Sequence, residues 1–231
     1  MDETGWRIGG QTAWLWVASS AAHTVYNVAW GRRFEDATGL VPEEYDGTIV
    51  RDGYVVYRNY TRARHQTCAA HLVRRCVEMI EADHPQGQAT PRQVKTLLLE
   101  ALAARDLPDT ERAVEADRIG EAIDAIIARP QHCDPDRRLI KHLANERHAL
   151  FTFLTDPAVD ATNWRGEQAI RPAVVNRKVW GGNRSERGAA TQSRVMTYFR
   201  TAAQQGIDPI AGLVALARAP DRHIIGGLGL T

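Results

Sequence analysis

A carboxylate at the end of a short apolar segment is the first candidate for chemistry in this sequence. Residues 48–50 are β-branched and lie between two glycines, which predicts a buried strand that ends at Asp52. In sheets flanked by helices, ligands bind in the crevice at the carboxyl ends of the strands. Asp52 is therefore a candidate for binding a substrate or a metal ion. The alternative is that it caps a helix expected at 54–60.

Asp2 is the second acidic candidate, at the start of the first expected strand and on the same face of the pleat as Thr4. If the first and fourth strands are neighbours at the centre of a sheet, Asp2 and Asp52 converge. A third carboxylate from a late helix would complete a site of hard oxygen ligands. Such a site suits two Mg²⁺ ions, which prefer carboxylates and keep water or phosphate oxygens as further ligands.

The elements that must position these residues begin with three strands. Strand-like runs at 2–8 and 12–17 flank a glycine pair, which predicts a hairpin, and a third strand is expected at 24–30. A helix at 33–40, the strand ending at Asp52, the helix at 54–60 and a strand at 64–68 follow. A meander followed by alternating helices and strands predicts an α/β fold with a mixed sheet and helices on its faces.

The sequence between residues 85 and 155 has helical periodicity. Residues 69–82 form a helix that a proline- and glycine-containing segment ends, and three apolar stripes then repeat at helical spacing. We interpret 85–155 as an all-helical insertion into a core formed by 1–84 and 156–205. A further helix and a tail are expected within 206–231.

The segment that should carry the third carboxylate begins after residue 156. Thr162 and Asn163 are expected to cap a helix, which Pro172 limits to a short length without a kink. Residues 174–180 are expected to be extended and 181–188 to form a glycine-rich loop. Helices are then expected at 189–205 and from Asp208 to about 218.

The net charge of +1 hides a strongly basic segment. Residues 163–200 contain eight basic side chains and two acidic ones, a local charge of +6. This charge suits a polyanion such as DNA, although a solvated arginine-rich face is the common alternative. The sequence has no apolar run long enough for a membrane span and no recognisable leader. Its three cysteines are too few for a disulfide framework, so we expect a protein of the reducing cytoplasm.

Several short motifs occur in a fixed order between the first residue and about residue 209. They are Asp2-Glu3-Thr4-Gly5-Trp6, Trp14-Leu15-Trp16, Asp52-Gly53-Tyr54 with Tyr57, Cys68-Ala69-Ala70-His71 with Arg74-Arg75, and Thr162-Asn163 with Glu167, Arg171-Pro172 and the Gly-Asn-Arg-Ser loop. This ordered set resembles the catalytic domain of the transposases of insertion-sequence family 66. These enzymes belong to the DDE group and have a ribonuclease-H-like fold.

The resemblance implies a function and a set of site residues. It implies metal-dependent DNA cleavage and strand transfer, with Asp2, Asp52 and Glu167 as the catalytic residues that bind two Mg²⁺ or Mn²⁺ ions. Glu186 is the less favoured third carboxylate. Cys68 and His71 are expected at the edge of the active site. Transposon ends and target DNA are the implied substrates, in a homodimer. The residues expected to contact DNA are Arg165, Arg171, Arg177, Lys178, Arg184 and Arg187.

Three alternatives remain open from the sequence. Only Met1 precedes Asp2, whereas the family places a DNA-binding region there, so the chain is expected to be truncated. It could then be a non-catalytic remnant that binds DNA or a transposase partner. It could also be a ribonuclease-H-like nuclease that does not require transposon ends. A zinc site formed by His65, Cys68, His71 and Cys76 is sterically possible but unusual.

Overall fold

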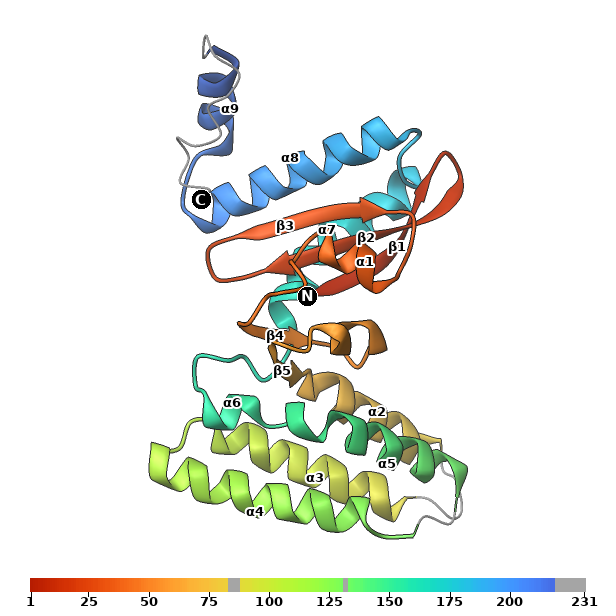
Figure 1. Ribbon diagram of the computed structural model, residues 1–231, viewed down its shortest axis with the longest axis vertical. Coiled ribbons are helices and arrows are strands. Elements are labelled where there is room, and N and C mark those ends of the chain that lie inside the picture. The colour runs from red at the N-terminus through yellow and green to blue at the C-terminus, as the bar shows by residue number, and fades with distance from the viewer. Residues whose placement is uncertain (83–87, 131–132, 219–231) are drawn as a thin grey trace. The chain divides into compact units, whose positions relative to one another are not determined.

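The computed structural model describes residues 1–82, 88–130 and 133–218, and the predicted tail lies outside this part of the chain. The chain divides into two compact units (Figure 1). Unit 1 contains Met1–Asp2 and Arg33–Glu167, and unit 2 contains Glu3–Arg32 and the chain from Gln168. Within the described residues, no helix has both the length and the apolar character needed to cross a membrane.

Unit 2 contains a three-stranded sheet in the order β1 (Asp2–Ile8), β2 (Gln11–Ser19) and β3 (Thr24–Ala29). Gly9 and Gly10 connect the first two strands with φ angles of 56° and 82°, a conformation that favours glycine at both positions. Strands β2 and β3 are antiparallel, with Trp16 opposite Asn27. The hairpin and the third strand predicted from the sequence are confirmed.

Helices α7 (Trp164–Trp180), α8 (Glu186–Gln204) and α9 (Pro209–Arg218) follow in the chain. One face of α7 packs against the sheet, and its buried positions repeat at helical spacing: Ala169, Ile170 and Ala173. Helix α8 covers the edge of β3. The hydroxyl groups of Thr197 and Thr201 accept hydrogen bonds from the backbone nitrogens of Tyr26 and Thr24, at 3.0 and 3.1 Å. This contact covers a strand edge that would otherwise present unpaired backbone groups.

Unit 1 contains a parallel pair of strands, β4 (Thr48–Arg51) and β5 (Arg64–Thr67), in which Arg51 lies opposite Thr67. The short helices are α1 (Phe34–Thr38), η1 (Val55–Asn59), η2 (Arg147–Ala149) and α6 (Thr152–Thr155). The long helices are α2 (Ala69–Glu81), α3 (Ala89–Ala104), α4 (Asp109–Ile127) and α5 (Asp134–Glu146).

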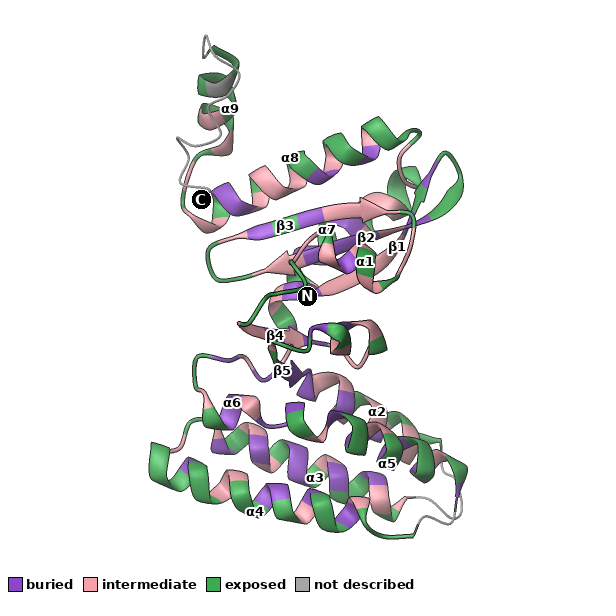
Figure 2. Cartoon of the chain, in the orientation of Figure 1, coloured by how far each residue is buried: buried purple, intermediate pink, exposed green. Residues whose placement is uncertain are grey.

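The predicted apolar stripes of these helices share one core. Leu98, Ile119, Ile123, Leu139 and Leu143 are almost completely buried together. Buried positions recur along α3 and α4 and alternate with exposed ones (Figure 2). The expectation that the three stripes pack on each other is therefore confirmed.

Three details of the predicted elements are wrong. The described strands pair as two sheets rather than one mixed sheet, although the α/β class is confirmed. The helix expected at 54–60 is a 3₁₀ helix at Val55–Asn59. Residues 174–180 are helical because α7 continues through Pro172. Proline removes the donor for the carbonyl of Gln168, and both Gln168 and Pro172 are exposed residues, so Pro172 interrupts α7 on its exposed side.

Candidate active site

The parallel pairing of β4 and β5 places Asp52 and Cys68 at the same edge, because each residue follows the last residue of its strand. The Cys68 nitrogen donates to the Arg51 carbonyl at 2.8 Å and extends the ladder by one bond. Asp52 Oδ1 accepts from the Tyr54 nitrogen at 2.8 Å. This bond fixes the direction of the carboxylate at the strand end and caps the turn that leads into η1.

Asn163 joins three segments of unit 1 at this edge. Its side-chain nitrogen donates to the Met1 carbonyl at 2.9 Å, and its backbone nitrogen donates to the Cys68 sulfur at 3.2 Å. The Met1 nitrogen in turn donates to the Val50 carbonyl at 2.8 Å. Residues that precede Asp2, Asp52 and Glu167 by one to four positions are thus linked by direct hydrogen bonds.

The first turn of α7 depends on a glycine beside Asn163. A Cβ atom at Gly166 would lie 2.7 Å from the Asn163 side-chain oxygen, so only glycine permits this approach. The Glu167 nitrogen donates to the Asn163 carbonyl at 3.0 Å, within the helix. Asn163 therefore fixes the start of the helix and the position of Glu167 at once.

Glu167 lies against Cys68 and His71. One ligand atom from each of the three side chains lies within 4.8 Å of the other two. The distance between His71 Nδ1 and Glu167 Oε1 is 3.6 Å, and both side chains are somewhat more than one third exposed. Cys68 and His71, which the resemblance places at the edge of an active site, are thus neighbours of Glu167.

The charges of this group are coupled. The contact with the Cys68 side chain raises the pKa of His71 most, burial opposes it, and the charges of Glu167 and Asp52 raise it further. Burial would raise the pKa of the Cys68 thiol, but the contacts with His71 and the Asn163 nitrogen lower it overall. Asp52 and Glu167 therefore both act on the same imidazole.

A buried ionic cluster lies behind the strand end. Arg51 and Glu146 are paired at 2.7 Å with neither side chain exposed, and Arg58 pairs with the other Glu146 oxygen at 2.6 Å. Thr67 donates its hydroxyl hydrogen to Glu146 as well. Arg51 also donates to the Asp52 carbonyl at 2.9 Å. The cluster therefore holds the backbone on both sides of the β4 end.

The sequence analysis missed Glu146, although a signal was present. Glu146 follows Leu139 and Leu143 on the buried face of α5 and precedes Leu150 at the same helical spacing. A charged residue inside an apolar stripe requires a buried partner of opposite charge, because an unpaired buried charge is strongly unfavourable.

The zinc site considered from the sequence does not form. Both ring nitrogens of His65 are occupied, since Nδ1 accepts from Arg51 Nε at 3.2 Å and Nε2 contacts the Tyr60 carbonyl at 2.9 Å. Cys76 is completely buried in the apolar core of the long helices. Cys68 and His71 are therefore grouped with Glu167 rather than with these two residues.

The predicted DNA-contacting residues differ in their surroundings. Arg165 pairs with Asp160 at 2.7 Å and lies over the Trp164 ring. Arg177 donates to the Thr4 hydroxyl at 3.0 Å. Four of the six side chains are exposed: Arg171, Lys178, Arg184 and Arg187.

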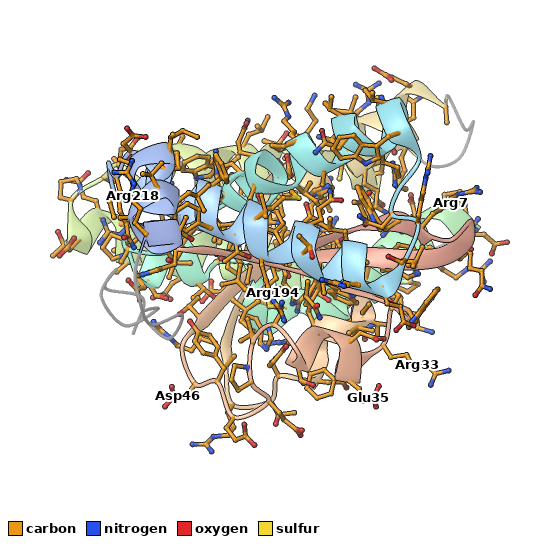
Figure 3. The ribbon with its side chains drawn as sticks, turned by 90° about the horizontal axis from the view of Figure 1, so that it is seen from above. Arg7, Arg33, Glu35, Asp46, Arg194 and Arg218 are labelled. Atoms are coloured by element: carbon orange, nitrogen blue, oxygen red, sulfur yellow. The ribbon has the colours of Figure 1, made fainter. Side chains whose placement is uncertain are left out.

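The loop that carries Arg184 is attached to the end of β1. Asn183 exchanges backbone bonds of 2.8 Å with Arg7 and Gly9, and its side-chain oxygen accepts from Trp6 Nε1 at 2.7 Å. Arg7 is itself exposed, and Figure 3 labels it and Arg194 of α8 at separate places in the view. Glu186 accepts from Trp30 Nε1 at 3.0 Å.

These features define an α/β protein in which acidic, thiol and imidazole side chains gather at the carboxyl edge of a parallel strand pair. The family model described as Transposase IS66 family matches residues 1–191, so the chain belongs to the IS66 family of transposases. It is similar to the uncharacterized protein y4qI of Sinorhizobium fredii (strain NBRC 101917 / NGR234), with 27% identity over 208 residues. That alignment covers 77% of this chain and 38% of the relative, so the chain spans about two fifths of that protein. No solved structure matches the chain.

Proposed function

We propose that unit 1 carries the catalytic centre of a DDE transposase, in which Asp2, Asp52 and Glu167 supply the acidic side chains. The observation that carries this proposal is the set of hydrogen bonds that joins Met1, Val50 and Asn163. Each of these three residues precedes one of the three carboxylates by one to four positions. Family membership supports a role in DNA transposition.

The donor chemistry fits a site for hard divalent ions. All three side chains are carboxylates, and all three are half-buried, which leaves them accessible from solvent. Oδ2 of Asp52 accepts no hydrogen bond from the described residues, so this oxygen is available to a ligand. When bound, two Mg²⁺ or Mn²⁺ ions would supply activation of the attacking hydroxyl and stabilisation of the leaving oxygen in an in-line phosphoryl transfer.

The protein residues have separate tasks in this proposal. The Tyr54 nitrogen orients the Asp52 carboxylate, and Asn163 fixes the turn from which Glu167 projects. The exposed cations Arg171, Lys178, Arg184 and Arg187 would bind phosphates of the DNA backbone.

A strand-transfer assay on DNA with terminal inverted repeats tests the proposal. We expect Mg²⁺-dependent joining by the wild-type protein and a loss of at least about 100-fold in Asp52→Asn and Glu167→Gln. Glu186→Gln is the matched control, because it removes an exposed carboxylate of the same segment and should keep activity. If Glu186→Gln is inactive and Glu167→Gln is active, the third carboxylate is misassigned. If all three variants match the wild type, the catalytic proposal is wrong.

The exposed cations also support a second candidate, a DNA-binding protein without catalytic activity. This candidate predicts binding that weakens with salt and no cleavage under any metal condition. Cleavage of DNA that lacks transposon ends would instead indicate a structure-specific nuclease.

A further inference from the structure

Cys68, His71 and Glu167 offer three chemically different donors at one point. The ligand atoms on one Zn²⁺ ion are about 3.3 to 3.8 Å apart, as follows from tetrahedral geometry with bonds of about 2.0 to 2.3 Å. The three donor atoms here lie within 4.8 Å of one another. Movements of about 1 Å by the partly exposed side chains of His71 and Glu167 would therefore bring the three donor atoms to ligand distances.

The His71 ring gives a second, independent indication of a ligand. Its Nδ1 atom is shielded from solvent and makes no hydrogen bond of normal geometry in the described part of the chain, although the Cys68 side chain lies close enough to raise the pKa of the ring. The Glu167 oxygen at 3.6 Å is too far away to accept a hydrogen bond. A buried ring nitrogen without a partner is unfavourable, and a cation between it and the carboxylate would satisfy both groups.

The backbone places two of the donor residues, Cys68 and His71, at the same end of α2. Cys68 immediately precedes α2 and His71 lies in its first turn, so the two side chains are three residues apart at one helix end. The amino end of a helix stabilises a thiolate, which is the form that binds metal. The Asn163 nitrogen donates to the sulfur at 3.2 Å, which fixes the thiol without occupying the His71 ring.

We propose that Cys68, His71 and Glu167 bind one borderline-soft divalent cation, Zn²⁺ foremost, with a fourth coordination position left open to water or to a phosphate oxygen. A sulfur, a nitrogen and an oxygen ligand are the mixed donor set of zinc sites and exclude Mg²⁺ as the preferred ion. This site shares Glu167 with the proposed hard-ion site. Bound Zn²⁺ would therefore withdraw Glu167 from the proposed reaction and inhibit it, a consequence that rests on the proposed function, whereas the binding itself does not.

Titration of the protein with Co²⁺ tests the binding, because Co²⁺ replaces Zn²⁺ and gives a visible spectrum with a thiolate charge-transfer band. We expect one equivalent to bind with that band, and excess Zn²⁺ to remove it. His71→Ala and Glu167→Gln should weaken binding by at least about 100-fold, since even indirect partners of metal ligands contribute 10- to 100-fold. Cys68→Ser should remove the charge-transfer band.

Two matched controls separate this site from other thiols and imidazoles. Cys133→Ser changes another buried cysteine, and His23→Ala changes a histidine of unit 2, so both should bind Co²⁺ like the wild type. Serine at position 68 keeps an acceptor for the Asn163 nitrogen, and circular dichroism checks folding. If Cys68→Ser does not fold, the test of the site rests on His71→Ala, which changes a partly exposed side chain.

The proposal is overturned if the dissociation constant for Co²⁺ is above about 100 μM, because that affinity would be weak for a protein zinc site. It is also overturned if the band is absent, or if Cys68→Ser and His71→Ala bind like the wild type. Binding by a protein that shows no strand transfer would refute the proposed function and leave the metal site standing. Strand transfer that Zn²⁺ does not inhibit at saturation would refute the shared use of Glu167.

Discussion

Arg51 and Glu146 form an ion pair with no exposed surface, in which Nη1 and Oε2 are 2.7 Å apart. One partner is the last residue of β4 and the other the last residue of α5. The pair therefore connects the strand that ends beside Asp52 to the helical core of unit 1. Arg58 and Thr67 complete the partners of the carboxylate.

Glu146→Gln should strongly destabilise unit 1. The substitution leaves the buried Arg51 guanidinium without its counter-charge, and loss of one partner of a buried pair costs about 3 to 5 kcal/mol. Urea denaturation measures the change in the free energy of unfolding. Glu115→Gln is the control, because it breaks an exposed pair with Arg118 and should have little effect. Equal effects of the two substitutions would contradict a structural role for the buried pair.

The Glu146 carboxylate should make the free energy of unfolding depend on pH in the acid range. Burial would raise the pKa of Glu146, but the hydrogen bond from Thr67 and the charge of Arg51 lower it overall. Its pKa in the folded state is then below the unfolded value of about 4.3, so its stabilisation is present above that pH and lost as the pH falls through the folded pKa. We expect the stability difference between wild type and Glu146→Gln to shrink below about pH 4. A difference that stays constant in acid would contradict this.

Gly53→Ala should disturb the position of Asp52. A Cβ atom at Gly53 would lie 2.5 Å from Cε1 of His142, so the ring or the strand end must move. Crowding of this kind costs about 1 to 3 kcal/mol, measured by urea denaturation. The double variant Gly53→Ala/His142→Ala removes the obstructing ring and should recover most of the loss. Failure to recover would assign the effect to the backbone of Gly53 itself.

Substitutions of the basic residues of unit 2 should fall into two groups, those that weaken DNA binding and those that lower stability. Arg184→Ala and Arg187→Ala should each weaken DNA binding and reduce the salt slope by about 1, without loss of stability, because both side chains are exposed. Arg177→Ala should instead destabilise unit 2 by about 1 to 3 kcal/mol, because it removes the donor to Thr4 and to the Gly5 carbonyl. Fluorescence anisotropy across a salt series and thermal unfolding distinguish the two effects.

Local patterns predicted the elements of this chain well. The β-branched run before Asp52, the glycine pair after Ile8 and the apolar stripes of the long helices each depend on neighbouring residues alone. One error has a tertiary cause. Residues 174–180 read as extended because Pro172 suggested a helix end, but packing of Ala169 and Ala173 on the sheet favours a continuous helix.

Local patterns and the ordered motif set identified some residues of the candidate site and not others. Asp52 and Cys68 could be placed because each ends a strand, and Glu167 because it occurs in an ordered motif. The role of Asn163 depends on contacts with Met1 and Cys68, which are 162 and 95 residues away along the chain. No local pattern encodes such contacts. The pairing of Arg51 with Glu146 was likewise hidden, although Glu146 interrupts an apolar stripe.

The buried pair between β4 and α5 affects how loss-of-function alleles from a genetic screen of this protein should be interpreted. Alleles that lose transposition would be expected at acidic residues, and Glu146 would be recovered among them although it lies behind the strand end. Growth at low temperature separates the two kinds of allele. A folding defect at Glu146 would be partly suppressed in the cold, whereas loss of one of the three carboxylates proposed to bind ions would be equally severe at every temperature.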